Sequence, residues 1–103
     1  ISEANAFSKR NNLNQNKLYD AIKDGAAGSW QFMNRYKTIN NNKFNFGFSS
    51  ELMEKDLRYV LKQSENNKLD LKLTKNVHKR YKKLLTTKYR DLDTSSLIKS
   101  FLK

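Results

Sequence analysis

The stretch FGFSSELMEKDLRYV, residues 46–60, decides how this sequence folds, because it predicts an amphipathic helix that begins at Ser49 or Ser50. On a helical wheel, an apolar arc about half a turn wide is formed by Leu52, Met53, Leu57, Val60 and Leu61. Asp56 falls inside this arc, about 40° from Leu52, and Lys55 falls about 60° outside its edge. A carboxylate without a partner in a dry core is costly, so we expect Asp56 to be paired or reached by water.

The composition limits the class of protein. The chain has 103 residues, which suit one domain with a modest core, and its six Phe, five Tyr and one Trp argue against disorder. It contains no Cys, which excludes disulfides and thiolate metal sites and fits the cytoplasm or another reducing compartment. No apolar run approaches the roughly 18 residues of a membrane span. We therefore expect a soluble protein without membrane contact.

The charge raises the question of nucleic-acid binding. The formal net charge is +11, from 21 basic and 10 acidic residues, but only five of the basic residues are arginines. The run HKRYKK at residues 78–83 is the best candidate for such a surface. On the wheel, however, Tyr81 lies with Val77 and Leu84 rather than among the lysines. A solvated helix face is favoured, and a basic helical nucleic-acid-binding module remains the alternative function.

Helical periodicity and capping residues predict an all-α domain of about six helices. The expected helices cover residues 2–10, 15–24, 30–39, 51–65 and 74–86, and a short last one that follows Asp93 or Thr94. Asn14 and Ser29 are expected to cap the second and third helices. Residues 66–73 alternate apolar and polar side chains, but a lone strand has nothing to pair with, so a connector is expected there.

The first helix lacks a convincing start. Ala4, Ala6 and Phe7 share one face, but Ser2 alone is a weak cap and no hydrophobic staple precedes it. Ile1 is not a start methionine. These features predict that the sequence is a fragment cut from a longer helix.

The remaining candidates for chemistry have ordinary structural interpretations. The lone His78 with scattered carboxylates makes no metal site or catalytic triad, so a partly buried, hydrogen-bonded histidine is expected. Trp30 is expected in the core. Two interpretations of the alternating Phe44, Phe46 and Phe48 stay open. They either anchor a loop in the core or form a hydrophobic wall beside a ligand.

Five segments, taken in order, resemble the C-terminal helical domain of the β-hydroxyacid dehydrogenases, a fold of the type found in 6-phosphogluconate dehydrogenase. They are SEANAFSKRNNLNQNKLYDAI, GAAGSW, FGFSSELMEKDLRYVL, LDLKLTKNVHKRYKKL and DLDTSSLI. The family includes 3-hydroxyisobutyrate dehydrogenase and the glyoxylate and succinic semialdehyde reductases. The most specific piece of the resemblance consists of Phe48, Leu52, Met53, Lys55, Asp56 and Leu57.

The resemblance implies that residues 1–103 are the C-terminal domain of a two-domain enzyme. An upstream Rossmann domain would bind NAD or NADP and would be the partner of this domain. The family's catalytic lysine lies before the glutamate-alanine pair matched by Glu3 and Ala4, and so upstream of Ile1. The resemblance therefore implies no catalytic residue, no metal site and no bound cofactor in this fragment.

The same resemblance assigns roles to three residues. Lys55 matches a lysine that reaches the nicotinamide cofactor, and Phe48 and Asp56 match positions that line or buttress the substrate cleft. The implied substrate is a small carboxylate such as 3-hydroxyisobutyrate, and the implied assembly is a dimer or larger homo-oligomer. On this interpretation Asp56 faces an active site between two domains rather than a dry core.

Overall fold

The computed structural model describes residues 1–102 and confirms the predicted all-α fold. The helices are α1 (Ser2–Arg10), α2 (Gln15–Ile22), α3 (Trp30–Asn40), α4 (Ser50–Asn66) and α5 (Lys72–Leu84), followed by the 3-10 helix η1 (Thr94–Ser100). The observed bounds of the five α-helices lie within two residues of the predicted ones. The last helix differs in type, since it is 3-10 rather than α.

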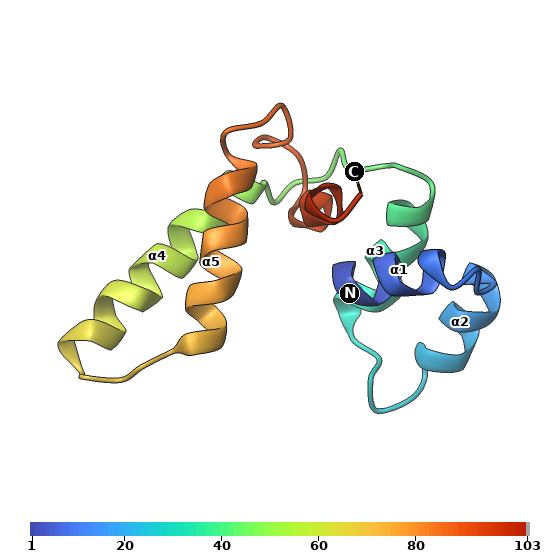
Figure 1. Ribbon diagram of the computed structural model, residues 1–103, viewed down its shortest axis with the longest axis horizontal. Helices are drawn as coiled ribbons and strands as arrows, with labels where there is room; N and C mark the ends of the chain where they lie inside the picture. The colour runs from blue at the N-terminus through green and yellow to red at the C-terminus, as the bar shows by residue number, and fades with distance from the viewer. Residues whose placement is uncertain (103) are drawn as a thin grey trace.

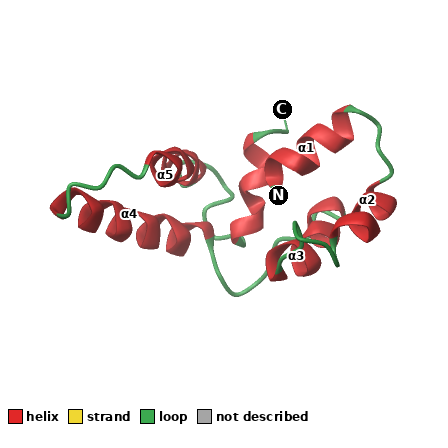
Figure 2. Ribbon diagram, turned by 90° about the horizontal axis from the view of Figure 1, so that it is seen from below, coloured by secondary structure: helices red, strands yellow, loops and turns green. Residues whose placement is uncertain are grey.

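The helices form two groups joined by η1. Helices α4 and α5 pack side by side as an antiparallel hairpin, and α1, α2 and α3 form a separate cluster (Figure 1). The 3-10 helix lies between the two groups and contacts α1, α3, α4 and α5. A view turned by 90° shows the same separation of hairpin and cluster (Figure 2). The short η1 therefore carries much of the packing between the two halves.

Side-chain caps fix where the helices begin, as the sequence predicts. The side chain of Asn14 accepts a hydrogen bond from the Lys17 amide, and Ser29 does the same for the Phe32 amide. Ser49 caps α4 in the same way, and Asp93 caps η1. Each cap satisfies an amide that the first helical turn leaves without a partner. Helices α1 and α5 have no side-chain cap.

Three helices end in a left-handed residue that is not glycine. Asn12, Asn42 and Lys68 have φ angles of 55°, 56° and 55° and follow α1, α3 and α4. Asparagine tolerates this conformation because its short side chain bonds locally, whereas lysine has no such compensation. The chain thus turns after these helices without the glycine usual at such ends.

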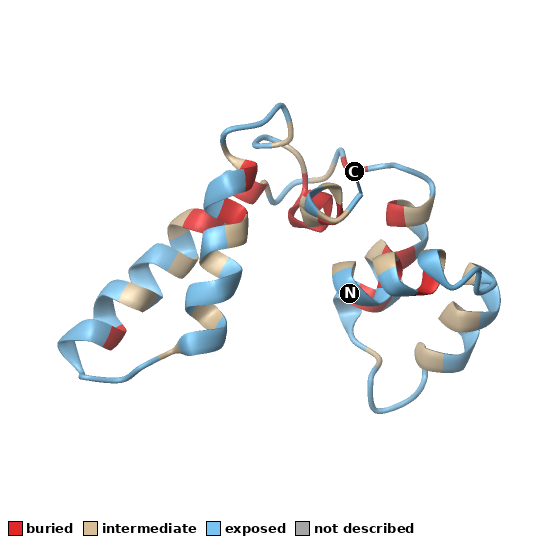
Figure 3. Ribbon diagram, in the orientation of Figure 1, coloured by how far each residue is buried: buried red, intermediate tan, exposed pale blue. Residues whose placement is uncertain are grey.

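The apolar core is small and lies where the two groups meet. Ile39, Phe44 and Ile98 form its buried centre, and Ala6, Leu92 and Phe101 pack against it. The buried positions gather around η1, α3 and the adjoining ends of α4 and α5, while the far half of the hairpin is mostly exposed (Figure 3). The hairpin is consequently anchored at one end only.

The predicted buried positions of Phe7 and Trp30 are wrong. Helix α1 buries Asn5 and Ser8 rather than its apolar residues, and Phe7 is 68% exposed. Asn5 makes a polar contact with α3, in which its side-chain Nδ2 donates a hydrogen bond to Asn40 Oδ1 over 2.9 Å. Trp30, expected in the core, is 62% exposed.

Helix α4 is also rotated relative to the expectation. Its buried residues are Ser50, Glu54 and Ser64, while Leu52 and Val60 of the predicted apolar arc are exposed. Glu54 can face α5 because His78 Nε2 lies 2.8 Å from its carboxylate. The acid in the helix interface is therefore Glu54, and Asp56 is on the exposed side.

The carboxylate of Asp93 forms the centre of the junction between the two groups. Asp93 is only 2% exposed. Its Oδ2 accepts hydrogen bonds from Arg35 Nε over 3.2 Å, from the Ser95 amide over 2.9 Å and from Ser95 Oγ over 2.5 Å. A buried charge is tolerated when it is paired and hydrogen-bonded in this way.

Backbone hydrogen bonds on either side of Asp93 join three chain segments. The Asp93 amide donates to the carbonyl of Phe44 over 2.9 Å, and the Thr94 amide donates to the carbonyl of Phe48 over 3.0 Å. The Ser50 amide donates to the carbonyl of Leu92 over 2.8 Å. The loop before α4, the start of α4 and the start of η1 are thus locked together.

Replacing the buried carboxylate tests this role. We predict that Asp93→Ala lowers the free energy of unfolding by about 3–5 kcal/mol, because it leaves Arg35 without its partner and removes the η1 cap. Urea denaturation followed by circular dichroism measures the change. The exposed Asp91→Ala is the matched control and should alter stability by less than about 0.5 kcal/mol. Similar effects of the two variants would contradict the role assigned to Asp93.

Tyr81 connects η1 to α5. Its hydroxyl donates to the carbonyl of Thr94 over 2.9 Å. Burial, with a smaller contribution from the Asp93 carboxylate, raises the pKa of Tyr81 from 10.0 to about 12. The protonated phenol is therefore the form that the fold stabilises.

This pKa shift predicts a loss of stability in alkaline solution. Because the folded pKa lies above the unfolded one, the contribution is complete below pH 10 and is lost as the pH rises to about 12. Over that range, wild type should lose up to about 1.4 kcal/mol per pH unit more than Tyr81→Phe does. Urea denaturation of both proteins at several pH values checks this. Parallel pH dependences would refute the prediction.

Candidate functional site

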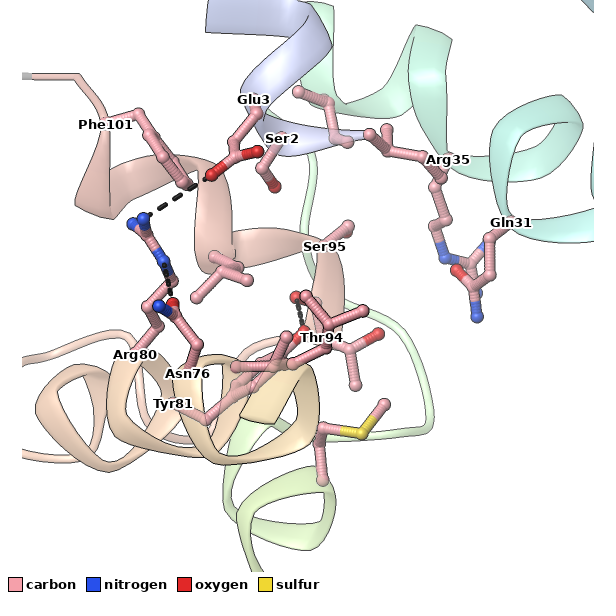
Figure 4. A pocket seen from close by; sticks show the side chains of 16 residues that line it. Ser2, Glu3, Gln31, Arg35, Asn76, Arg80, Tyr81, Thr94, Ser95 and Phe101 are labelled. Carbon is pink, nitrogen blue, oxygen red and sulfur yellow. Dashed lines mark hydrogen bonds and ion pairs between the residues drawn. The ribbon is translucent and has the colours of Figure 1, made fainter. Parts of the chain in front are cut away.

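A cleft of about 550 Å³ separates the α1–α3 cluster from the α4–α5 hairpin. All the helices except α2 contribute to it, and η1 forms its floor between the two groups (Figure 4). Its lining residues are Ile1, Ser2, Glu3, Gln31, Arg35, Ile39, Met53, Leu73, Asn76, Val77, Arg80, Tyr81, Thr94, Ser95, Leu97 and Phe101. The cleft is the best-formed concave site among the described residues, so it is the candidate functional site.

Apolar side chains on both sides of the cleft are exposed. Leu73 of α5 is 85% exposed and Val77, one turn further along, is 39% exposed. Ile1, at the start of α1, is also exposed. Contiguous apolar surface of this kind marks a site of contact with another molecule or domain.

An ion pair bridges the cleft at the α1 end. Arg80 Nη2 of α5 lies 3.4 Å from Glu3 Oε1 of α1, and Arg80 Nε donates to Asn76 Oδ1 over 3.3 Å (Figure 4). Both partners of the ion pair are exposed, so its contribution to stability is small. It does satisfy the charge of Arg80 on that side of the cleft.

Arg35 lies on the α3 side of the cleft. Its guanidinium carbon is 4.1 Å from the centre of the Phe46 ring and 5.0 Å from that of the Trp30 ring. Its Nε donates to Asp93, and Nη1 donates to the carbonyl of Asn34 over 3.3 Å. The local sequence pattern does not single out Arg35, because its partner Asp93 is 58 residues away in the chain.

Phe44, Phe46 and Phe48, which were expected either to anchor a loop in the core or to line a ligand site, differ in their surroundings. Phe44 is buried and anchors the loop in the core, whereas Phe46 packs on Arg35. Phe48 is 40% exposed and occupies the position before the α4 cap. The sequence alone did not separate these positions, because it does not show which way the loop turns.

None of the predicted site residues Phe48, Lys55 and Asp56 is among the residues that line the cleft. Lys55 is half-buried and Asp56 is exposed to water, which is one of the two environments expected for this carboxylate. Met53, three residues before Asp56 on α4, does line the cleft.

His78 has the structural environment that the sequence predicts. It is mostly buried, and its Nε2 is paired with Glu54 across the hairpin. Glu54 also lies 3.4 Å from Arg58 Nε on its own helix. These contacts explain the histidine through packing of α4 against α5.

The basic face of α5 matches the prediction for a solvated surface. Lys79, Lys82 and Lys83 are exposed, while Tyr81 is buried. A buried ring cannot stack on bases, which is the contact that single-stranded nucleic acid requires. The arrangement favours a solvated face over a nucleic-acid interface.

No group of three or more His, Cys, Asp or Glu side chains gathers among residues 1–102 in a way that would hold a metal ion. No helix of this described part is long and apolar enough to cross a membrane.

The fold is that of a helical domain found in solved 3-hydroxyisobutyrate dehydrogenases. The enzyme of that name from Salmonella typhimurium superposes with a TM-score of 0.88 at 23% identity over 96% of this chain and 35% of its own. The Mycobacterium tuberculosis enzyme, solved with L-serine, also gives 0.88, at 24% identity over 99% of this chain and 37% of its own.

The sequence comparisons agree with the fold. A family model described as "NAD-binding of NADP-dependent 3-hydroxyisobutyrate dehydrogenase" matches residues 1–101, and this chain belongs to that family. An uncharacterized oxidoreductase of Shewanella frigidimarina is 36% identical over 95% of this chain and 34% of its own length. The L-threonate dehydrogenase of Cupriavidus necator is 30% identical over 97% and 34%. The chain thus spans about a third of the curated relatives it matches.

Proposed function

We propose that residues 1–103 are the C-terminal, substrate-side domain of an NAD(P)-dependent oxidoreductase that acts on a small hydroxy acid such as 3-hydroxyisobutyrate. The family match over residues 1–101 is the observation that carries this proposal. The reaction is reversible hydride transfer between the nicotinamide and the hydroxy acid, a step whose chemistry the cofactor supplies. The remaining two thirds of such an enzyme would provide the dinucleotide-binding fold and the catalytic lysine.

The cleft is the proposed contact with that second domain. Its exposed apolar residues, Leu73, Val77 and Ile1, have no cover within the described residues. Figure 1 shows the N-terminus on the side of the cluster that faces the hairpin, so a preceding segment of the same chain would enter at the cleft. Apolar surface of this kind also supports a contribution to a homo-oligomer.

Three residues near the start of α4 are proposed to meet the cofactor and the substrate. Lys55 would reach the cofactor, and Phe48 and Asp56 would border the substrate. Their partial or full exposure supports these roles, because a docked domain can reach them. Lys55 and Asp56 point about 100° apart, so they would contact different groups.

Cofactor binding by the isolated chain tests the proposal that the main NAD(P)-binding site lies outside residues 1–103. We expect no submicromolar binding of NADH to the 103-residue protein, because it lacks the glycine-rich turn that holds the pyrophosphate. Contact with one end of the cofactor, through Lys55, contributes too little by itself. Isothermal titration calorimetry measures the affinity. Tight binding would show that the cofactor site lies within these residues.

The role of Lys55 is tested in the full-length enzyme. Lys55→Ala should weaken NAD(P)H affinity or turnover by an amount on the order of 1–3 kcal/mol, through loss of a charge-assisted contact. The matched control is Lys62→Ala, which removes an exposed lysine from the same helix. Steady-state kinetics with varied cofactor distinguish the two variants. Equal kinetics for both would leave Lys55 as an ordinary surface residue.

A further inference from the structure

A histidine and a glutamate form the polar contact inside the α4–α5 hairpin. His78 Nε2 of α5 lies 2.8 Å from Glu54 Oε1 of α4, and the two side chains are only 16% and 11% exposed. Within residues 1–102, this pair is the one side-chain hydrogen bond or ion pair that joins α4 to α5. Histidine is the side chain that ordinarily changes charge near neutral pH, so the charge of this contact depends on pH.

The pair lies directly behind two residues of the cleft wall. Met53 precedes Glu54 in α4, Val77 precedes His78 in α5, and both Met53 and Val77 line the cleft. The hairpin is held to the rest of the domain at one end only (Figure 3). Contacts between its two helices therefore determine how firmly this wall is held.

Other charged groups near His78 are more exposed than Glu54. Those that line a shallow hollow together with the histidine are Arg58, Lys62 and Glu65 of α4 and Lys75 of α5, and η1 contributes no residue to this hollow. All four are exposed, as is Lys82, one turn after His78 on α5, and Lys75 is paired with Asp70. Water and salt screen exposed charges, whereas Glu54 is in direct and shielded contact. Glu54 is therefore the charge that acts most strongly on His78.

The contact is stronger when His78 carries a proton. A neutral imidazole can still donate a hydrogen bond, but it leaves the shielded Glu54 carboxylate with the exposed Arg58, 3.4 Å away, as its only other ionic partner within the described residues. Protonation turns the same contact into a charge-assisted hydrogen bond, which is about twice as strong as a neutral one. Burial opposes the charge on the imidazole, and the adjacent carboxylate offsets this cost.

We propose that the Glu54–His78 pair is a pH-sensitive clamp on the α4–α5 wall of the cleft. Because the folded state favours the protonated histidine, the clamp contributes fully below the ordinary titration range of histidine, about pH 6.5. Its contribution is lost as the pH rises through and above that range. The wall is thus held more firmly in mildly acidic solution than in alkaline solution. This property belongs to the hairpin itself and does not depend on the proposed function.

A double-mutant cycle measures the clamp in the 103-residue protein. Urea denaturation of wild type, Glu54→Gln, His78→Gln and the double variant gives the factor by which the pair favours folding. This factor should be about tenfold greater at pH 5.5 than at pH 8.5. The matched control is the exposed pair on the same hairpin, Asp70 and Lys75, tested as Asp70→Asn and Lys75→Gln. Its factor should be the same at both pH values, because neither side chain ordinarily titrates between them.

The comparison of the two pH values decides the proposal. A Glu54–His78 factor that is equal at both, or greater at pH 8.5, would overturn it.

A pH titration of the wild type by NMR tests the link to the cleft without any destabilising variant. The chain contains a single histidine, so the ring signals of His78 are assigned without ambiguity. The methyl signals of Met53 and Val77 should shift with the same midpoint as the ring signals, and Glu54→Gln should abolish the shift of the methyl signals. Methyl signals that do not follow the histidine would overturn the proposed effect on the cleft wall.

Discussion

The buried carboxylate of Asp93 holds the two halves of the domain in one arrangement. It caps η1 through Ser95 and reaches α3 through Arg35, and its own amide is bonded to the loop that leads into α4. The apolar core at this junction is small, so these polar contacts help to fix how the two halves pack against each other. Together with the packing of η1, these contacts hold the hairpin and the cluster on either side of the cleft.

The cleft follows from how the hairpin is attached. Helices α4 and α5 are anchored only where they meet η1, so their far half projects away from the α1–α3 cluster (Figure 3). Apolar residues such as Leu73 remain exposed along the open side. Arg35, held against the cluster by Asp93, places a fixed positive group at this opening.

The helical wheel predicted the wrong buried face for α4. The apolar arc around Leu52 predicted the buried side and put Asp56 within it, but the helix is rotated so that Glu54 faces α5. Glu54 is paired there with His78, while Leu52 and Val60 are exposed. Helix α1 likewise buries Asn5 rather than Phe7. In both helices a buried polar residue has a partner on another element.

The sequence by itself determined the helices, most of their caps and the likeness to the hydroxyacid dehydrogenases, because these depend on residues close together in the chain. Ser29, Ser49 and Asp93 act within three residues of themselves, so their roles are readable from the local pattern. Only the tertiary structure decided which helix faces are buried, and it alone joined Arg35 to Asp93, 58 positions apart. Such contacts depend on how distant elements pack, and helical periodicity carries no information about that.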